Sequence, residues 1–283
     1  MQLIHTKNKL RTFVREARAQ GKTIGFVPTM GYLHAGHGSL IQTARKQNDV
    51  VVVSVFVNPT QFGPNEDLSA YPRDAERDLA LMRTHGADVA FFPNVEEIYP
   101  AGFTTYVEVQ GPMTATLCGR SRPGHFRGVA TVVTKLFHMA APDRAYFGQK
   151  DAQQVAVIQQ MTRDLDFDLQ IVVCPTLREP DGLAMSSRNV YLSTAERAQA
   201  PTISKALFEA EAMIQKGERT VAAVSQHIQK KLQTMPGAAI DYISIVDART
   251  LADLETLHST VLIAVAVKLG RTRLIDNIRV DVS

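Results

Sequence analysis

The segment from Val27 to His37 constrains the fold of this chain more than any other stretch of the sequence. It contains two glycines and two histidines, and it follows the short run 23–26, which is typical of a buried strand. Beyond it, the helical spacing of Leu40, Ile41 and Ala44 predicts a helix. In open parallel α/β sheets, ligands bind at such turns, where the carboxyl end of a strand leads into a helix.

The residues of this turn favour an anionic ligand. A helix N-terminus offers N–H groups and the positive end of the helix dipole, and both suit a phosphate group. Gly31 and Gly36 let a ligand approach the backbone, and the spacing of His34 and His37 places both on one side of a helical turn. A histidine pair can also bind a metal, but the zinc-protease pattern with its adjacent glutamate is absent. Taken alone, the turn leaves phosphate binding and a purely structural role equally open.

Composition indicates an ordinary globular protein large enough for two domains. Of its 283 residues, 45% are hydrophobic and 21% are charged, and the net charge of +3 is too small to indicate nucleic-acid binding. Cys118 and Cys174 form no Cys-x-x-Cys pattern, which argues against a disulfide scaffold or a zinc knuckle. The sequence shows neither a signal peptide nor an apolar run of membrane-spanning length, so we expect a cytoplasmic protein without membrane contact.

Strands and helices are predicted to alternate over residues 1–178. After the first strand, runs of apolar and β-branched residues predict strands at 49–56, 88–92, 105–109, 143–147 and 168–174. Helices are predicted at 7–20, in the segment that ends at Gly86, and at 129–141. This alternation predicts an α/β fold with a Rossmann-like parallel sheet and helices on both faces.

Polar residues follow two more of these strands. Asn58 and Gln61 come after strand 49–56, and we expect them near the first turn because parallel strands end at the same edge; ordinary Asn-Pro turn chemistry is the alternative. The segment 148–154 repeats the order of strand, glycine, polar residues and helix. Its Lys150 fits phosphate binding as a point charge, or an ordinary surface position.

Two further segments have compositions that suit an anion. The loop 119–128 holds three arginines and one histidine among glycines, although in isolation it is more typical of a solvated basic loop. Residues 186–188 (Ser-Ser-Arg) combine two hydroxyl groups with one cation, but this tripeptide alone is too common to be specific.

The pattern changes to helices followed by strands in the last third of the chain. A capping box at 193–196 opens a helix that is predicted to run to Gly217, and a second helix is predicted at 220–233. Strands are then predicted at 240–246, 261–267 and 272–280. The sequence therefore predicts a first domain over 1–178 and a smaller C-terminal α+β domain, a lid, over 179–283.

Several segments together resemble a known family. The common ATPase and dinucleotide fingerprints are absent, whereas 34–37 and 185–188 resemble the two signatures of the nucleotidylyltransferase and class I aminoacyl-tRNA synthetase superfamily. Further segments resemble the pantothenate synthetase (pantoate–β-alanine ligase) family in its own order, and so does the ending 273–277. These segments are 28–37, 55–62, 71–73, 121–128, 147–154 and 186–189.

This resemblance implies an ATP-dependent ligase. The pantoate carboxylate would attack the α-phosphate of ATP, which forms pantoyl adenylate and releases pyrophosphate. The amine of β-alanine would then attack the adenylate and give pantothenate and AMP. The family also implies Mg²⁺ on the phosphates, small-molecule partners rather than nucleic acid or membrane, and a homodimer.

The resemblance further implies roles for matching residues of this chain. The residues implied in catalysis are His37, His34 and Lys150. Those implied in pantoate binding are Gln61, Gln154, Arg122 and His125; Gln61 would also contact β-alanine, and Asp78 matches a position associated with the metal. The residues implied in ATP binding are Met30, Gly31, Tyr32, Leu33, His34, Ala35, Gly36, His37, Gly148, Gln149, Lys150, Asp151, Leu177, Met185, Ser186, Ser187 and Arg188.

Two other functions stay open at this point. A nucleotidylyltransferase with another acceptor would share the histidine turn, but the segments around Gln61 and Gln154 argue against it. A nucleotide-binding regulatory or RNA-binding protein without catalytic activity is opposed by the modest net charge and by the retained histidines and lysine. A turnover assay separates these functions.

Overall fold

The computed structural model describes residues 1–64, 66 and 68–282, which divide into two compact units. Unit 1 comprises Met1–Gln110, Ser121–Gly148 and Val157–Pro175, and unit 2 comprises Gly111–Arg120, Gln149–Ala156 and Thr176–Ser283. The chain passes into unit 2 for the last time close to the expected boundary at 178. Two short segments earlier in the chain also belong to unit 2, and no change of composition marks them. The division into a nucleotide-binding domain and a lid domain stays a prediction.

Unit 1 contains a six-stranded parallel sheet in the order β1-β4-β3-β2-β5-β6. Its strands are β1 (Gln2–Ile4), β2 (Ile24–Thr29), β3 (Val50–Val55), β4 (Val89–Phe91), β5 (Arg144–Gly148) and β6 (Gln170–Cys174). The first four valines of β3 (residues 50–53) are buried, as expected for a central strand covered on both faces. Because β2 and β3 are adjacent and parallel, the turns that follow them lie at one edge of the sheet.

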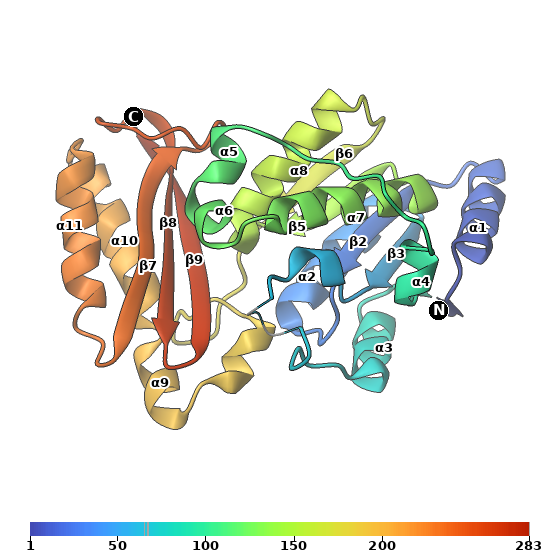
Figure 1. The fold of residues 1–283 in the computed structure, drawn as a ribbon, viewed down its shortest axis with the longest axis horizontal. Coiled ribbons are helices and arrows are strands. Elements are labelled where there is room, and N and C mark those ends of the chain that lie inside the picture. The colour runs from blue at the N-terminus through green and yellow to red at the C-terminus, as the bar shows by residue number, and fades with distance from the viewer. Residues whose placement is uncertain (65, 67, 283) are drawn as a thin grey trace. The chain divides into compact units, whose positions relative to one another are not determined.

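Helices cover both faces of this sheet (Figure 1), which confirms the predicted Rossmann-like fold. On one face, α2 (Ala35–Gln47) packs Ile41 and Ala44 into the same apolar core as Val51 and Val53 of β3. On the other face, α7 (His125–Ala140) places Phe137 edge-to-face against Phe26 of β2, with ring centroids 6.4 Å apart. Further helical elements are α1 (Lys7–Ala19), η1 (Pro59–Gln61), α3 (Ala75–Thr84), α4 (Val95–Ile98) and the later turns of α8 (Ala152–Asp164).

Unit 2 is built on an antiparallel sheet of β7 (Ala238–Asp247), β8 (Ser259–Leu269) and β9 (Thr272–Val282). The helices α10 (Thr202–Gln215) and α11 (Val221–Leu232) lie side by side against it (Figure 1) and share one apolar core with it. A smaller core contains Leu262 and Ala264 of β8 together with Leu117 and Ala156. The predicted α+β arrangement is therefore confirmed. Shorter elements are α5 (Pro112–Ala115), α6 (Leu117–Ser121), η2 (Gln149–Asp151), η3 (Ser187–Tyr191) and α9 (Thr194–Gln199).

Two predicted elements are wrong. Residues 105–109 are not a strand: the backbone of Val107 exchanges hydrogen bonds with the Thr131 hydroxyl on α7, and not with a neighbouring strand. The single helix predicted to run to Gly217 is two helices, because Pro201 lies between α9 and α10 and has no N–H to continue the first of them. The capping box at 193–196 is confirmed.

No helix within the described residues is both long and apolar enough to cross a membrane.

Candidate active site

The turn between β2 and α2 has a backbone that requires glycine at one position. Gly31 has φ +87°, and a Cβ atom there would lie 2.9 Å from Val55 Cγ1 and 3.1 Å from Asp78 Oδ2. Its neighbour Tyr32 also has a positive φ, of 50°. A non-glycine residue at position 31 would therefore be strained and would displace the turn from the sheet edge.

Asp78 of α3 holds this turn in place. Its carboxylate is 1% exposed and accepts two backbone N–H groups, from Tyr32 at 2.9 Å and from Leu33 at 2.6 Å. Burial raises the pKa of the Asp78 carboxyl above its ordinary value, although these two hydrogen bonds oppose the rise. Both carboxylate oxygens are thus used to position the turn.

This arrangement bears on the predicted metal site. The described residues contain no group of three or more His, Cys, Asp or Glu side chains that could hold a metal ion. Mg²⁺ in nucleotide enzymes commonly has one or two protein carboxylates and takes its other ligands from substrate phosphates and water. Among the described residues, the carboxylates present would fit an ion that is held mainly by a substrate phosphate and water. The assignment of Asp78 to the metal stays a prediction.

The two histidines form a reciprocal cap at the N-terminus of α2. His34 Nδ1 accepts the N–H of Gly36 at 3.1 Å, and the N–H of His34 donates to His37 Nδ1 at 3.3 Å. Because both Nδ1 atoms act as acceptors, each neutral ring carries its proton on Nε2. The rings lie 4.2 Å apart between centroids. The helix end thus combines two Nε2–H donors with the positive end of the helix dipole.

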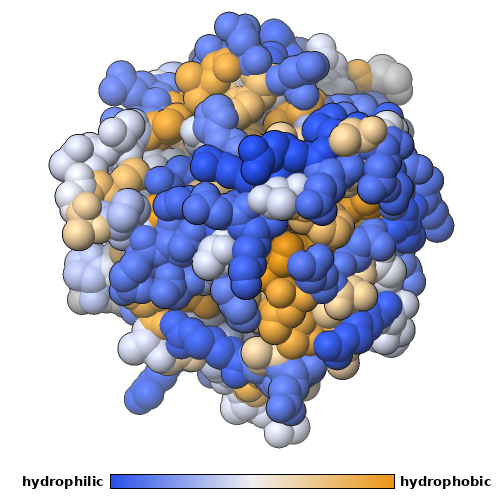
Figure 2. All heavy atoms as spheres, turned by 90° about the vertical axis from the view of Figure 1, so that its right-hand side faces the viewer, coloured by the Kyte–Doolittle hydropathy of each residue, from blue (hydrophilic) through white to orange (hydrophobic). Residues whose placement is uncertain are grey.

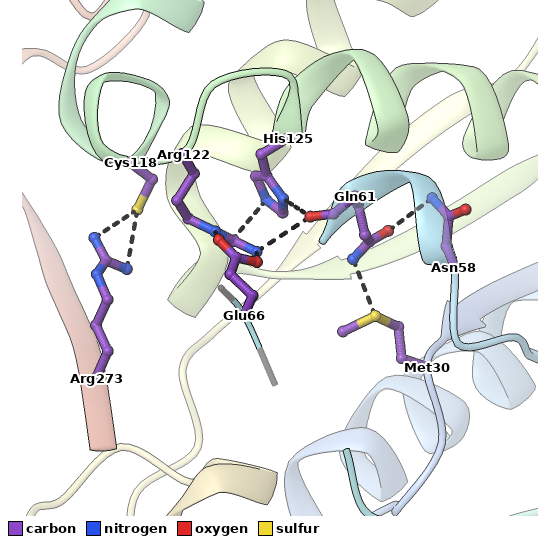
Figure 3. A network of polar contacts seen from close by, with 8 residues as sticks. All are labelled: Met30, Asn58, Gln61, Glu66, Cys118, Arg122, His125 and Arg273. Atoms are coloured by element: carbon purple, nitrogen blue, oxygen red, sulfur yellow. Dashed lines mark hydrogen bonds and ion pairs between the residues drawn. The ribbon is translucent and has the colours of Figure 1, made fainter. Parts of the chain in front are cut away.

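Gln61 is fixed between two residues of unit 1 (Figure 3). Its Oε1 accepts a hydrogen bond of 3.1 Å from Asn58, and its Nε2 lies 3.0 Å from the sulfur of Met30. Asn58 is itself 1% exposed, donates to the backbone of Gly128 and accepts from Thr60. Asn58 therefore acts as the support that sets the orientation of the Gln61 amide.

Arg122 and His125 hold the backbone of Gln61 (Figure 3). The Gln61 carbonyl accepts from His125 Nδ1 at 2.8 Å and from Arg122 at 3.3 Å. Arg122 also donates to His125 Nε2 at 3.0 Å, so this histidine is a neutral ring protonated at Nδ1. Glu66 receives two hydrogen bonds from the Arg122 guanidinium, at 2.6 and 2.7 Å. The sequence did not predict this partner, because an isolated glutamate carries no motif.

The pair formed by Glu66 and Arg122 predicts a pH-dependent contribution to stability. Burial tends to raise the pKa of the Glu66 carboxyl, but the hydrogen bonds and charge of Arg122 outweigh it and leave the pKa below the ordinary 4.5. The stabilisation is then complete above pH 4.5 and is lost as the pH falls through the lower folded-state pKa.

We expect Glu66→Gln to lower the free energy of unfolding at pH 7 by about 1–2 kcal/mol, because the pair is partly exposed. Urea unfolding at pH 7 and at pH 3 measures this loss, which should shrink at the lower pH. Glu108→Gln, at an exposed position of unit 1, is the control. A loss of the same size at both pH values would contradict this account of the pair.

Lys150 lies in the 3₁₀ turn η2 of unit 2, directly after Gly148 at the end of β5. Its side chain is 19% exposed, and its Nζ lies 3.9 Å from Asp151 Oδ1.

In α8, the adjacent glutamines differ in environment. Gln153 is buried and binds the backbone of Cys118, Met113 and Thr116, whereas Gln154 is only half-buried.

The segment 185–188 continues a short backbone pairing in unit 2. The Met185 N–H donates to the carbonyl of the exposed Leu177 at 3.0 Å. Ser186 then caps η3, since its Oγ accepts the N–H of Arg188 at 3.2 Å. The two serines and the arginine therefore lie within one tight turn, with all three residues half-buried.

The structure groups the predicted residues within each unit. Unit 1 gathers the turn 30–37 and Asp78 at the ends of β2 and α3, and a second group formed by Gln61, Arg122 and His125. Unit 2 carries Lys150, Gln154 and the segment 185–188. The sequence carries no signal for Glu66, whereas the position of Asn58 at the end of a predicted strand indicated that it lies near the first turn, although not that it supports Gln61.

The parallel sheet with helices on both faces, together with a histidine-capped helix that follows a central strand, defines a Rossmann-like α/β protein. Within that class, the chain belongs to the pantoate–β-alanine ligase family, whose model matches residues 2–279.

Individual relatives agree with this family over the whole chain. Pantothenate synthetases from Acetivibrio thermocellus and Moorella thermoacetica are 55% and 54% identical to it, and each alignment covers 100% of both chains. The crystal structure of pantothenate synthetase from Thermus thermophilus superimposes with a TM-score of 0.94 at 47% identity, over 98% of this chain and 99% of that one. A pantoate–β-alanine ligase from Francisella tularensis, solved in complex with β-γ ATP and β-alanine, matches with a TM-score of 0.79 at 36% identity, over 98% and 97%.

Proposed function

We propose that this protein condenses pantoate with β-alanine in an ATP-dependent reaction that passes through pantoyl adenylate and releases AMP and pyrophosphate. Membership of the pantoate–β-alanine ligase family over residues 2–279 supports the overall reaction. The observation that carries the adenylation step is the reciprocal histidine cap of α2, which directs two Nε2–H donors from a helix N-terminus.

Adenylation requires little covalent help from a protein. The pantoate carboxylate attacks the α-phosphate, and charge develops on the phosphate oxygens as pyrophosphate leaves. Donors that are already oriented toward those oxygens lower the barrier, because they need no reorganisation during the reaction. In this proposal His34 and His37 donate to phosphate oxygens, and Lys150 adds a positive charge. Ser186, Ser187 and Arg188 bind the triphosphate, and Mg²⁺ enters with ATP.

Gln61 is suited to bind pantoate and to contact β-alanine. Its Nε2 is 3.0 Å from the Met30 thioether, which is a weak acceptor, so a ligand oxygen can replace the sulfur at low cost. A neutral amide also orients a hydroxy acid without forming an ion pair with the carboxylate that must react. Since Glu66 neutralises Arg122, the clearest role of Arg122 and His125 is to hold the Gln61 backbone beside the pantoate.

Gln154→Ala is expected to weaken pantoate binding and leave ATP binding unchanged. The half-buried amide of Gln154 would donate to an anionic ligand, and the loss of one such hydrogen bond corresponds to an affinity about 10- to 100-fold lower. Calorimetric titration of each ligand measures both affinities. Gln160→Ala, on the same helix, is the matched control. Equal losses for pantoate and ATP would refute a contact that is specific for pantoate.

The exposed apolar surface of unit 1 supports self-association into a homodimer. The strand β1 is at the edge of the parallel sheet, and Met1 and Leu3 are 40% and 45% exposed. Figure 2 shows a hydrophobic area among hydrophilic residues on one face of the molecule. An edge strand presents backbone N–H and C=O groups with which a second chain can pair. We also place the enzyme in the cytoplasm, because both cysteines are free and the proposed substrates are small soluble molecules.

The overall reaction is tested with the purified protein, ATP, Mg²⁺, pantoate and β-alanine. We expect AMP and pantothenate to form in equal amounts, and only when all three substrates are present. If AMP forms with another carboxylic acid or amine but not with this pair, the acceptor assignment is wrong.

A further inference from the structure

Asn277 is a buried polar residue whose side chain binds a segment of unit 2 that lies outside the antiparallel sheet. It lies in β9, opposite Ala264 of β8, and only 4% of it is exposed. Its side-chain hydrogen bonds all reach one short segment outside the sheet. The Nδ2 group donates to the carbonyls of Gln149 at 3.0 Å and Lys150 at 2.8 Å, and Oδ1 accepts from Gln149 Nε2 at 3.0 Å.

We infer that Asn277 is a positioning residue for Lys150, and that it fixes the η2 turn from which the Lys150 side chain extends. The inference rests on the phosphate-binding role proposed above for Lys150. Asn277 acts through the lysine backbone, so its contribution concerns where the ammonium group lies and not the chemistry that this group performs.

Asn277 gives the η2 turn a support from outside its own segment. It comprises only Gln149–Asp151, and a 3₁₀ turn of three residues has too few internal hydrogen bonds to define its own geometry. Asn277 uses both Nδ2 hydrogens on two consecutive carbonyls of this turn. These two bonds fix the peptide planes on either side of the Lys150 Cα atom. They therefore restrict the direction in which the side chain leaves the backbone.

The support is itself rigid. β9 pairs with β8 along its whole length, from Thr272 to Val282. The N–H of Asn277 also donates to the carboxylate of Asp276 at 2.8 Å, and Asp276 forms a partly buried two-point ion pair with Arg178 at 2.6 and 3.0 Å. A functional group held by elements of regular structure is positioned more reproducibly than one carried by a loop alone.

A double-mutant cycle on the adenylation rate separates positioning from a general structural role. We would measure single-turnover formation of adenylate for the wild type, Asn277→Ala, Lys150→Met and the double variant. Asn277→Ala should slow adenylation about 10²-fold, as expected for a displaced reactive group. In the Lys150→Met background the same substitution should have almost no further effect, because no ammonium group remains to be positioned.

Two further variants complete the design. Asn277→Asp keeps the size of the side chain but cannot donate to the two carbonyls, so it should be at least as slow as Asn277→Ala and provides the test if the alanine variant fails to fold. Val280→Ala removes apolar contacts from a buried β9 residue that packs in the core shared with α10 and α11, and it should lower the melting temperature while leaving the adenylation rate unchanged.

The outcomes distinguish this inference from the proposed function. A loss for Asn277→Ala that is equally large with and without Lys150 would overturn the positioning role, and so would a normal rate for Asn277→Asp. If Lys150→Met alone left adenylation unchanged, the proposed role of Lys150 itself would be wrong. Non-additive losses, with a normal rate for Val280→Ala, are the expected result.

Discussion

Lys150→Met is expected to slow adenylate formation about 10²- to 10³-fold, the range found when one preorganised charge-stabilising group is removed. Methionine keeps most of the length of the lysine side chain but removes its positive charge. The charge that develops on the phosphate oxygens would then lose a partner that the proposal places beside it. Rapid-quench measurement of the first turnover with saturating ATP and pantoate gives the rate constant of this step directly.

Two further variants test whether the effect of Lys150→Met is due to the loss of charge at this position. Lys268→Met removes an exposed lysine of β8 in the same unit and should have no effect on the rate. Lys150→Arg retains the charge but changes its geometry, so we expect it to recover part of the lost rate. If Lys150→Met weakened ATP binding without slowing the chemical step, the residue would bind the ground state only, and its catalytic role would be refuted.

His37→Ala is expected to lower the adenylation rate by about 10²-fold or more, which is the typical cost of removing one preorganised donor. The reason is geometric: His37 Nδ1 accepts the N–H of His34, so the neutral ring keeps its proton on Nε2 for a phosphate oxygen. The substitution also removes half of the reciprocal cap. A second variant is therefore needed to separate capping from catalysis.

His37→Asn serves that purpose, because asparagine can still accept a backbone N–H at the helix N-terminus but does not reproduce the Nε2–H donor. It should retain the stability of the wild type and remain slow in adenylation. His138→Ala, at an exposed position of α7, is the control and should be as fast as the wild type. Single-turnover adenylation at the wild-type rate in His37→Ala would rule out the assigned role.

The parallel sheet could be predicted because the composition of its central strands is typical of buried strands. The valine run of β3 has the composition of a strand buried on both faces, and glycine ends α1 and α3 as expected. The three-residue strand β1 was missed because so short a run carries no periodicity. The failure at 105–109 has a different cause: alternation predicted a strand, but a threonine hydroxyl of α7 satisfies the backbone of Val107.

The candidate site could likewise be predicted only where its residues are close together in the sequence. Local order along the chain predicted the histidine turn, since its strand, glycines and helix are contiguous. The supports of this turn and of Gln61 come from distant positions, and no spacing rule connects Asp78 with Leu33 or Glu66 with Arg122. Residues that hold a site depend on tertiary contacts, so single-sequence patterns indicate candidate ligand-binding groups but not the groups that position them.

The central claim is that this protein forms pantoyl adenylate from ATP and pantoate. The most direct test is isotope exchange between labelled pyrophosphate and ATP in the presence of Mg²⁺, with and without pantoate, and with β-alanine omitted. The account predicts that label enters ATP only when pantoate is present. Folded protein that binds ATP but shows no exchange with pantoate, or exchange that does not depend on pantoate, would contradict it.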